Sequence, residues 1–494
     1  MRGFLASSVG VSCAAALALP LALPTPAQAG PSAVTSESAV PGSTQSLPLV
    51  PLTGERALGS TASGQGLTRQ DVRPFSLLGV IWDDPNRELH GRVQVRARAA
   101  RTGHWSGWQN VETHNHEHAA DPDTAEGASR RVHGSTAPLW VGDSDGVEVR
   151  VDAQQAAGGE RARVPGRSPL PRGLHLELVD PGADPPRAGA QTGGTHWWAR
   201  ARGVRAGMPV HTPAGDVTAG APAQAQRSAA GAPGATAGSP ERAAESAASA
   251  ANVDLAPLGA TEIPALSHRE TERAFLAARR SGQRVKPYTG AKPYIGARPR
   301  IITRRGWGAN ERLRERGFVY TKKVKAAFVH HTASGNNYRC SQVPSVIRSI
   351  YRYHVVSSGW RDIGYNFLVD KCGNIYEGRA GGVAKPVMGA HTRGFNTNSM
   401  GIAVLGSFSD TKPSGAALKA IARLTAWKLG LYGANPRGRT YLKSGGGNLY
   451  RKGKNVRLNV ISGHRDGFAT ECPGRLLYGK LGSARKAAAR YQGR

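Results

Sequence analysis

Cysteine and aromatic residues are scarce in this sequence. Of 494 residues, 4 are cysteines and 6% are Phe, Trp or Tyr, whereas glycine, alanine and proline are abundant. A chain with so few large apolar side chains cannot form packed core along its whole length. The length leaves room for two or three domains joined by linkers. Beyond the N-terminal region, no segment is apolar enough to span a bilayer.

The one long apolar run lies at the N-terminus. It follows an early arginine and ends in small residues at Ala27 and Ala29. This layout predicts a secretory signal peptide over residues 1–29, cleaved after Ala29. The alternative is a membrane anchor, but Pro20 and Pro24 interrupt the run and no stop-transfer charges follow it. We therefore expect a secreted protein, extracellular or in the cell wall, without a stable membrane anchor.

Acidic residues are also few. The chain has 34 Asp and Glu against 65 Lys and Arg, which gives a net charge of +31. Such a chain attracts polyanions. Outside a cell, anionic wall polymers or a membrane surface are more plausible partners than nucleic acid, so we expect no nucleic-acid partner. The alternative is that the basic surface only reflects general composition.

Composition divides the N-terminal half of the chain. Residues 30–69 are rich in Ser, Thr, Pro and Gly, and we predict them to be disordered. Residues 70–180 contain alternating apolar positions, which predict a small all-β, sandwich-like domain of unknown role. These positions include Val93, Val95, Val147, Val149, Val151, Leu174, Leu176 and Leu178. Four tryptophans can supply its core: Trp82, Trp105, Trp108 and Trp140.

The segment "HNHEH" in this domain places His114, His116 and His118 on one side of an extended chain. Three imidazoles on one side can hold a metal ion. However, no partner ligand is evident, and the neighbouring acidic residues are typical of a solvated loop. We interpret the segment as such a loop.

Residues 181–296 form a tract of Pro, Ala, Gly and Ser that cannot bury enough apolar surface to fold. We predict a flexible linker, with a possible short helix over residues 269–282.

The remaining residues, 297–494, have the pattern of a globular α/β domain. Short buried strands are predicted at residues 325–331, 401–406 and 457–462, with a hairpin that turns at Cys372 to Asn374. Two amphipathic helices are predicted at residues 341–355 and 416–430, the first with Ser341 as its N-cap. Strands mixed with helices indicate a central sheet covered by helices.

Three cysteines remain after the signal peptide, which is an odd number for an exported protein. Two can form a disulfide, and the third needs another role. Cys472 follows His464 by eight positions, in the stretch "GHRDGFATECPG". A catalytic zinc ion takes three protein ligands, commonly His nitrogen and Cys sulfur. A third ligand is available in "FVHHTAS", where a buried strand ends in His330 and His331. Strand alternation points these two in opposite directions, so only one faces the site, and the sequence does not decide which.

Five blocks of the C-terminal domain together resemble the peptidoglycan recognition protein family, which includes type-2 N-acetylmuramoyl-L-alanine amidases. The resemblance covers residues from about 296 to 494. The blocks are "RRGWGANE" (304–311), "AAFVHHTAS" (326–334), residues 359–382 with "GWRDIGYNF", "GAHTRGFNTNSMGIAVLG" (389–406) and "GHRDGFATECPG" (463–474).

The resemblance implies a mixed central β-sheet flanked by helices, with one catalytic zinc ion in a cleft. Its ligands would be His330, His464 and Cys472. Members that only bind peptidoglycan commonly lack the cysteine, so Cys472 favours an enzyme. The family also implies a disulfide between Cys340 and Cys372, which suits an exported protein.

Other residues take roles by the same resemblance. Tyr365 would hydrogen-bond the reacting centre, and Thr470 stands where some phage members have a lysine, so the proton-transfer residue is not identified. Substrate contacts are expected from His391, Arg379 and Asn396. His354, on the apolar stripe of its helix, is interpreted as a core histidine, and Glu377 receives no role.

The function implied is that of a secreted zinc-dependent N-acetylmuramoyl-L-alanine amidase, a monomer that cleaves the amide between the lactyl group and L-alanine in peptidoglycan. A zinc ion would lower the pKa of bound water from about 15.7 to about 7 for this reaction. Two alternatives stay open: a non-catalytic peptidoglycan-binding protein on the same fold, and a polyanion-binding protein that acts by charge alone. The domain at 70–180 would be a wall-binding or targeting module, a spacer or an interaction domain.

Overall fold

The computed structural model describes residues 42–52, 64–113, 115–154, 170–184, 240–281 and 293–494. The predicted signal peptide, His114 and residues 185–239 of the predicted linker lie outside the described residues. None of the helices in the described part of the chain has the length and apolar character that a membrane span requires.

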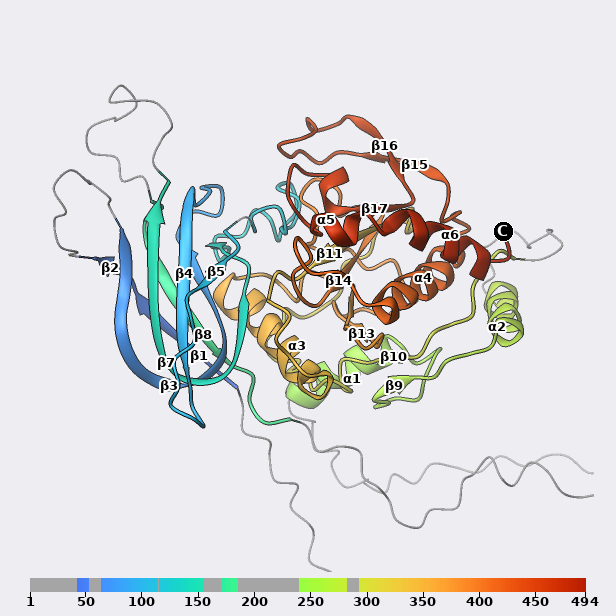
Figure 1. The fold of residues 1–494 in the computed structure, drawn as a ribbon. Coiled ribbons are helices and arrows are strands. Elements are labelled where there is room, and N and C mark those ends of the chain that lie inside the picture. Colours follow the sequence, from blue (N-terminus) through green and yellow to red (C-terminus); the bar gives the residue numbers. More distant parts are fainter. Residues whose placement is uncertain (1–41, 53–63, 114, 155–169, 185–239, 282–292) are drawn as a thin grey trace, which may run out of the picture. The chain divides into compact units, whose positions relative to one another are not determined.

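The N-terminal domain is an eight-stranded antiparallel sheet, drawn in blue to green in Figure 1. Its main path runs in the order β1-β8-β3-β7-β4-β5, and β2 and β6 both pair with the long strand β3. The strands are β1 (Ser43–Pro48), β2 (Val50–Pro51), β3 (Gln65–Trp82), β4 (Gly91–Ala99), β5 (Gln109–Val111), β6 (Gly134–Ser135), β7 (Leu139–Ala153) and β8 (His175–Asp180). The all-β prediction is confirmed.

The alternating apolar residues form the core of this sheet, as predicted. The buried positions include Val93, Val95, Val147, Val149, Val151, Leu174, Leu176 and Leu178. Trp82 and Trp140 are also buried. Trp105 and Trp108, expected in the core, are only half-buried, and the guanidinium groups of Arg69 and Arg150 lie 4.4 Å and 4.0 Å from their ring centres.

The predicted disorder of residues 30–69 is wrong where strands β1 and β2 and the start of β3 lie. All six residues of β1 pair with β8, from Ser43 opposite Asp180 to Pro48 opposite His175. The strand takes its hydrogen bonds from the backbone of a distant strand, and Leu49 just after it is buried in the core. A composition rich in Ser, Thr and Pro does not reveal such a partner, because backbone pairing depends little on side chains.

The C-terminal domain has a seven-stranded mixed sheet in the order β17-β11-β14-β12-β13-β10-β9. Its central strands β17, β11, β14 and β12 are parallel, and β12 and β13 form the predicted antiparallel hairpin. The strands are β9 (Glu262–Ile263), β10 (Ile301–Ile302), β11 (Ala326–His331), β12 (Phe367–Val369), β13 (Ile375–Glu377), β14 (Ser399–Val404) and β17 (Ile461–Gly463). A separate antiparallel pair is formed by β15 (Arg439–Lys443) and β16 (Asn455–Asn459).

Two helices and one strand occupy the segment that we predicted to be linker. They are α1 (Pro240–Ala250), β9 and α2 (His268–Ser281). Helix α2 coincides with the short helix expected at 269–282. Strand β9 extends the C-terminal sheet by pairing with β10, so the folded part of the domain begins well before residue 297.

Helices cover both faces of the C-terminal sheet, as predicted for an α/β domain. They are α3 (Val343–Arg352), α4 (Gly415–Gly430), α5 (Arg475–Tyr478) and α6 (Leu481–Tyr491). Ala327 and Val329 of β11 share a buried cluster with α4 and α6, which lie side by side in Figure 1. Leu368 of β12 and Ala403 of β14 pack instead with α3. The alternation of side chains along each strand produces these two layers.

Helix α3 differs from the prediction at both ends. A short 3₁₀ turn, Cys340–Gln342, precedes it, so Ser341 is not its N-cap, and a π-helical turn, Tyr353–Ser357, follows it. The chain then turns at Gly359, where φ is +74°, a backbone conformation that glycine adopts readily.

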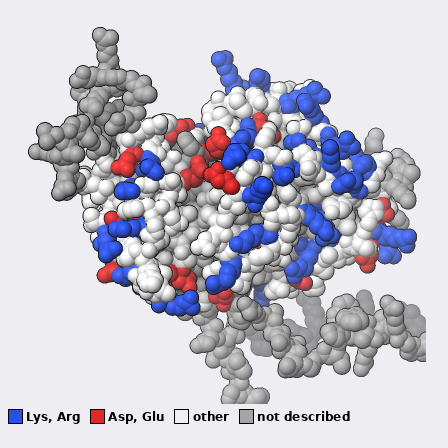
Figure 2. Space-filling view, in the orientation of Figure 1, with Lys and Arg blue, Asp and Glu red and all other residues white. Residues whose placement is uncertain are grey.

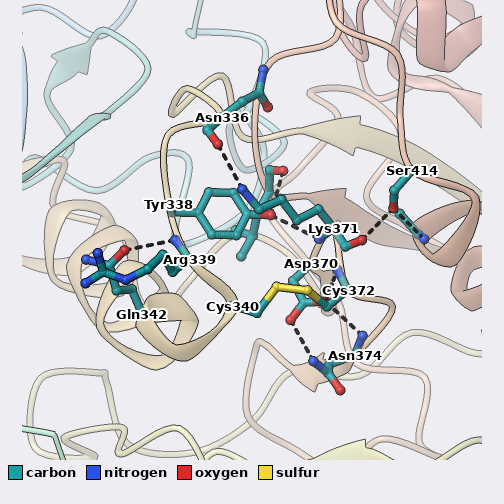
Figure 3. The surroundings of a disulfide bond; sticks show 12 residues. Asn336, Tyr338, Arg339, Cys340, Gln342, Asp370, Lys371, Cys372, Asn374 and Ser414 are labelled. Carbon is teal, nitrogen blue, oxygen red and sulfur yellow. Dashed lines mark hydrogen bonds between the residues drawn. A yellow bond between two sulfur atoms is a disulfide. The ribbon is translucent and has the colours of Figure 1, made fainter.

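A disulfide joins the start of helix α3 to the β12–β13 hairpin. Cys340 and Cys372 are bonded, with their Cα atoms 6.4 Å apart. Figure 3 shows Asp370 beneath this bond, where its carboxylate accepts hydrogen bonds from the backbone N–H groups of Cys372 and Asn374. The bond therefore ties the helix layer to the sheet at a rigid turn.

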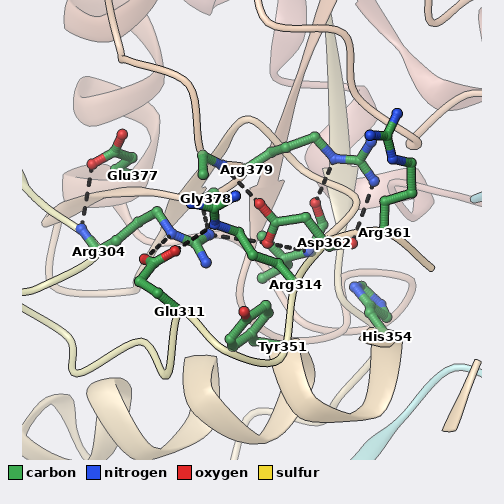
Figure 4. A network of polar contacts seen from close by, with 12 residues as sticks. Arg304, Glu311, Arg314, Tyr351, His354, Arg361, Asp362, Glu377, Gly378 and Arg379 are labelled. Carbon is green, nitrogen blue, oxygen red and sulfur yellow. Dashed lines mark hydrogen bonds and ion pairs between the residues drawn. The ribbon is translucent and has the colours of Figure 1, made fainter. Parts of the chain in front are cut away.

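A buried ionic network holds the "RRGWGANE" block against the sheet (Figure 4). The Arg304 guanidinium donates to Glu311 at 2.6 Å and to Asp362 at 3.0 Å, and all three side chains are buried. Glu377 accepts from the Arg304 backbone N–H and from Asn252. Burial raises the pKa of Glu377 to about 7. These contacts give Glu377 a structural place away from the candidate site described below.

Candidate metal centre

The parallel pairing of β11 and β17 brings two histidines together. The last pair in register is Val329 with Gly463, and the next residues along the two strands are His330 and His464. Their ring centres lie 4.5 Å apart. His330 lies near the carboxyl end of β11, and His464 directly follows the carboxyl end of β17. The carboxyl ends of parallel strands are the usual position of a functional site in a sheet with helices on both faces.

Strand alternation selects His330 over His331 for this site. Ala327 and Val329 face the layer of α4 and α6, so the side chains of Phe328 and His330 project to the opposite face. His331 is buried but is not part of the ligand cluster found among the described residues. The alternative that the sequence left open is decided by the packing of the strand.

Cys472 supplies a sulfur to the same point. It is the free cysteine of the described residues, is buried, and has its Sγ atom 3.8 Å from His330 Nδ1. The three ligands expected from the sequence are thus brought together. Because Cys340 and Cys372 are bonded to each other, Cys472 has no disulfide partner among the described cysteines.

A fourth residue, His118 of the N-terminal domain, joins this cluster. Its Nε2 atom lies 3.5 Å from Cys472 Sγ, and its ring centre lies 4.5 Å from that of His464. The four potential ligand atoms all lie within 4.8 Å of one another. Our interpretation of "HNHEH" as a solvated loop is therefore wrong for His118, which is only 4% exposed.

The cluster fits a zinc ion. Zinc bonds of about 2.0–2.1 Å to nitrogen and about 2.3 Å to sulfur place tetrahedral ligands on the order of 3.5 Å apart, close to the separations seen here. Both ring nitrogens of His464 and Nδ1 of His118 are buried without a hydrogen-bond partner of good geometry in the described structure. Such orphaned polar atoms call for a bound group.

Burial determines the protonation states of the four potential ligands in the absence of a metal ion. It lowers the pKa of His118, His330 and His464 well below the usual value, so these imidazoles are neutral and have a lone pair to offer. Burial also raises the pKa of the Cys472 thiol, which a bound cation would reverse, because a coordinating thiol loses its proton.

His391 contacts Nε2 of His330, the ring nitrogen that is not directed at Cys472. Its Nδ1 atom is 3.2 Å from His330 Nε2, and the Thr392 hydroxyl is 3.3 Å from the same nitrogen. These contacts leave Nδ1 of His330 directed at Cys472. His391 was expected to face the substrate, but its side chain is fully buried. It occupies the position of a residue that orients a metal ligand.

Tyr365 and Thr470 border the cluster. The Tyr365 ring centre lies 5.6 Å from that of His330 and 6.0 Å from that of His118. The Thr470 hydroxyl accepts a hydrogen bond from the Cys472 backbone N–H and donates one, of 2.7 Å, to Glu117 of the N-terminal domain. Both residues thus lie beside the potential ligands, and their catalytic roles stay predictions.

The two other predicted substrate contacts also meet the N-terminal domain. Arg379 forms two hydrogen bonds of 2.8 Å with the carboxylate of Glu126, and the side-chain amide of Asn396 donates to Asp121 at 2.7 Å and to the Ala119 carbonyl at 2.8 Å. No sequence pattern pointed to these contacts. The only available signal was the run of histidines at 114–118, which points to a metal but not to its location.

Comparisons with known proteins agree with this architecture. Residues 320–475 match the family described as N-acetylmuramoyl-L-alanine amidase, and residues 30–169 match the family described as Rv3811 N-terminal galactose-binding domain-like. The chain therefore has a galactose-binding-like N-terminal domain and a C-terminal domain of the amidase class.

The chain belongs to the peptidoglycan recognition protein and type-2 amidase family. Peptidoglycan-recognition protein SC2 of Drosophila melanogaster is 32% identical over 183 residues, which are 37% of this chain and 84% of that protein. Peptidoglycan-recognition protein SC1a of the same species is 32% identical over 185 residues, 37% of this chain and 83% of that protein.

Solved structures that are similar to this chain include that of peptidoglycan recognition protein-LE in complex with tracheal cytotoxin, a monomeric diaminopimelic acid-type peptidoglycan. It is 31% identical, with a TM-score of 0.29, over 37% of this chain and 92% of that chain.

Proposed function

We propose that this protein is a secreted, zinc-dependent N-acetylmuramoyl-L-alanine amidase that hydrolyses the amide between the lactyl group and L-alanine in peptidoglycan. The observation that supports it most is the convergence of His330, His464 and the unpaired Cys472 at one buried point. A thiol without a disulfide partner beside two neutral imidazoles has the composition of a catalytic zinc site.

When bound, a zinc ion at such a site supplies a Lewis acid and an activated water for attack on an amide carbonyl. The chain's own residues prepare the site. His391 and Thr392 fix the orientation of His330 through its Nε2 atom, so Nδ1 is available for coordination. Cys472 is placed by its backbone N–H, which donates to the Thr470 hydroxyl.

Tyr365 is suited to stabilise the negative charge that develops on the carbonyl oxygen. Burial, with the nearby Cys472 and Glu117, raises the pKa of its phenol well above the ordinary value. The phenol therefore keeps its proton at neutral pH and can donate a hydrogen bond to an oxyanion. Thr470 is a second candidate donor, provided that its hydroxyl is released from Glu117.

The charge of the molecule supports a location at an anionic wall. Lys and Arg side chains are widely spread over the face shown in Figure 2. The β15–β16 pair and the turn between its strands contribute exposed basic residues: Arg439, Lys443, Arg451, Lys452, Lys454 and Arg457. We therefore also propose that the protein is secreted and that it binds anionic wall polymers.

The amidase proposal is tested with the full-length protein, its Cys472→Ser variant and purified muropeptides. We expect about one zinc ion per chain and slow release of peptides that begin with L-alanine, which a chelator abolishes and added zinc restores. The variant should bind zinc far more weakly and release no peptide, because the hydroxyl is a poor replacement for a thiolate ligand. Zinc-loaded wild type and a zinc-loaded His118→Ala variant that both bind muropeptides but leave the amide intact would refute the proposal.

One observation favours a second candidate, a peptidoglycan-binding protein that does not cleave. Together with His118 the cluster has four protein ligands, the number found in closed structural zinc sites. The muropeptide digest described above distinguishes the amidase from the binding protein. A purely structural zinc ion would leave muropeptides uncut in every variant.

A further inference from the structure

We propose that the structure shows a latent state of the enzyme, in which the N-terminal domain closes the amidase site and His118 takes the ligand position that the reaction needs open. The blocking segment comprises residues 115–127, which lie between strands β5 and β6. The proposal rests on the proposed amidase function and goes beyond it, because it assigns the N-terminal domain a regulatory role.

Four potential protein ligands meet at this point, one more than a catalytic zinc site uses. A catalytic zinc keeps three protein ligands and leaves one position for water or substrate, whereas four protein ligands close the site. The Nε2 atom of His118 lies 3.5 Å from Cys472 Sγ, within the cluster of four ligand atoms. A metal held by all four residues has no open position.

The blocking segment also contacts the residues on which substrate binding is expected to depend. Glu117 accepts the hydrogen bond of Thr470, and Glu126 pairs with Arg379 through two contacts of 2.8 Å. Asn396 donates to Asp121. Substrate cannot reach these side chains while the segment holds them.

Backbone hydrogen bonds also hold the segment against the loop of the C-terminal domain that contains Asn396. The Arg393 N–H donates to the Glu117 carbonyl at 2.9 Å, and the Gly394 N–H donates to Asp121 at 2.8 Å. These bonds flank His118 in sequence, so they place its ring at the ligand cluster.

Three carboxylates of the blocking segment are buried. Glu117, Asp121 and Glu126 are 1%, 6% and 4% exposed. Burying a carboxylate costs several kcal/mol unless hydrogen bonds or charges compensate. Here the compensating groups named above come from the C-terminal domain. The conformation of the segment is therefore complementary to the amidase site, which an incidental contact would not require.

The segment can leave without unfolding its own domain. It contains turns but no helix or strand, and it is bounded by the ends of β5 at Val111 and β6 at Gly134. Release would break the ligand bond of His118 and the ion pair of Glu126 and leave the sheet intact. Peptidoglycan glycopeptide then competes with the segment for the same groups.

The test uses full-length protein loaded with Co²⁺, whose visible absorption reports coordination, and compares wild type with His118→Ala. His133→Ala is the matched control, because it removes a histidine between β5 and β6 that lies outside the cluster. We expect wild type and His133→Ala to give a spectrum that does not change with pH. His118→Ala should give a different spectrum that titrates near pH ~7, because water replaces the imidazole.

Hydrolysis of muropeptides by the zinc-loaded proteins gives the second readout. We expect His118→Ala to be at least about tenfold faster than wild type, which corresponds to about 1.4 kcal/mol. Glu126→Gln, which touches no ligand, should also raise the rate and speed hydrogen exchange in residues 115–127. This second variant keeps the proposal testable even if His118→Ala folds poorly.

The outcomes separate the two proposals. Identical Co²⁺ spectra and equal rates for wild type and His118→Ala would overturn latency while leaving the amidase intact. A changed spectrum without cleavage by any variant would support His118 as a ligand but overturn the amidase, and latency with it. Cleavage by His118→Ala that disappears in His118→Ala/Cys472→Ser would support both.

Discussion

Cys472 Sγ and His118 Nε2 lie 3.5 Å apart, although the two residues are separated by 354 positions in the sequence. The candidate metal centre is thus shared by two domains: three ligands come from the amidase domain, and the fourth comes from a segment of the galactose-binding-like domain. This sharing makes the state of the site depend on how the two domains are held together.

Replacing His391 by alanine is expected to weaken zinc binding. The imidazole of His391 contacts Nε2 of His330 at 3.2 Å, and loss of such an outer partner typically costs about 10–100-fold in metal affinity. Competition with a coloured chelator measures the change. His104→Ala, at an exposed position of the N-terminal domain, is the control and should leave the affinity unchanged. Equal affinities in both variants would remove His391 from its proposed positioning role.

Replacing Glu311 by alanine is expected to destabilise the fold by roughly 3–5 kcal/mol. Its carboxylate bridges Arg304 and Arg314, and all three side chains are buried. The substitution removes the carboxylate partner of Arg314 and leaves Arg304 with Asp362 alone. Urea denaturation measures the loss. Asp410→Ala breaks an exposed ion pair with Arg475 and should cost less than about 1 kcal/mol. Similar losses in the two variants would contradict this account of the network.

The histidine at position 354 makes stability depend on pH. It is buried, its ring centre lies 4.4 Å from that of Trp360, and its Nδ1 accepts a hydrogen bond from the Gly364 N–H. Burial, with a smaller contribution from Arg379, lowers its pKa to about 3. The unfolded chain therefore binds a proton below about pH 6.5 that the folded chain does not, and stability falls as the pH decreases toward 3.

Between pH 7 and pH 5 this group alone should cost about 2 kcal/mol. The comparison is between wild type and His354→Gln, each unfolded in urea at a series of pH values. The variant should be less stable at pH 7 and lose less stability on acidification. If both lose the same amount, His354 does not carry this pH dependence.

Removing the disulfide with the pair Cys340→Ser and Cys372→Ser is expected to lower stability by on the order of 3–4 kcal/mol, because the bond closes a loop between residues 32 positions apart. Thermal unfolding with and without reductant measures this. Reductant should lower the melting temperature of wild type to near that of the double variant, and should leave the variant itself unchanged. A wild type insensitive to reductant would show that the bond contributes little.

The sequence was most informative where a pattern is local. Alternating valines and leucines predicted strands β4, β7 and β8, and the apolar stripes predicted α3 and α4, because side-chain period and burial are linked within one element. The blocks that resemble the amidase family pointed to His330, His464 and Cys472, and the structure brings these three side chains together, while their role as metal ligands stays a prediction.

Prediction from the sequence failed where a segment is held by residues that are distant along the chain. Strand β1 is held by backbone bonds to β8, more than a hundred residues away in sequence, and its own composition is that of a linker. His118 is a candidate ligand only because the C-terminal domain meets the N-terminal one. The run "HNHEH" contains metal-binding side chains, but nothing in the sequence shows that His118 lies against the C-terminal domain.

Tyr353, in the π-helical turn after α3, donates toward the backbone carbonyls of Val80 and Thr136 in the N-terminal domain, and Leu77 and Trp140 pack in the same buried cluster as α3. A shortened chain that began after the first domain would uncover this aromatic and aliphatic surface and leave a hydroxyl without its acceptors. Exposed apolar patches of this kind promote self-association. The C-terminal domain produced alone should therefore aggregate, and a polar substitution at Tyr353 should help to keep it monomeric.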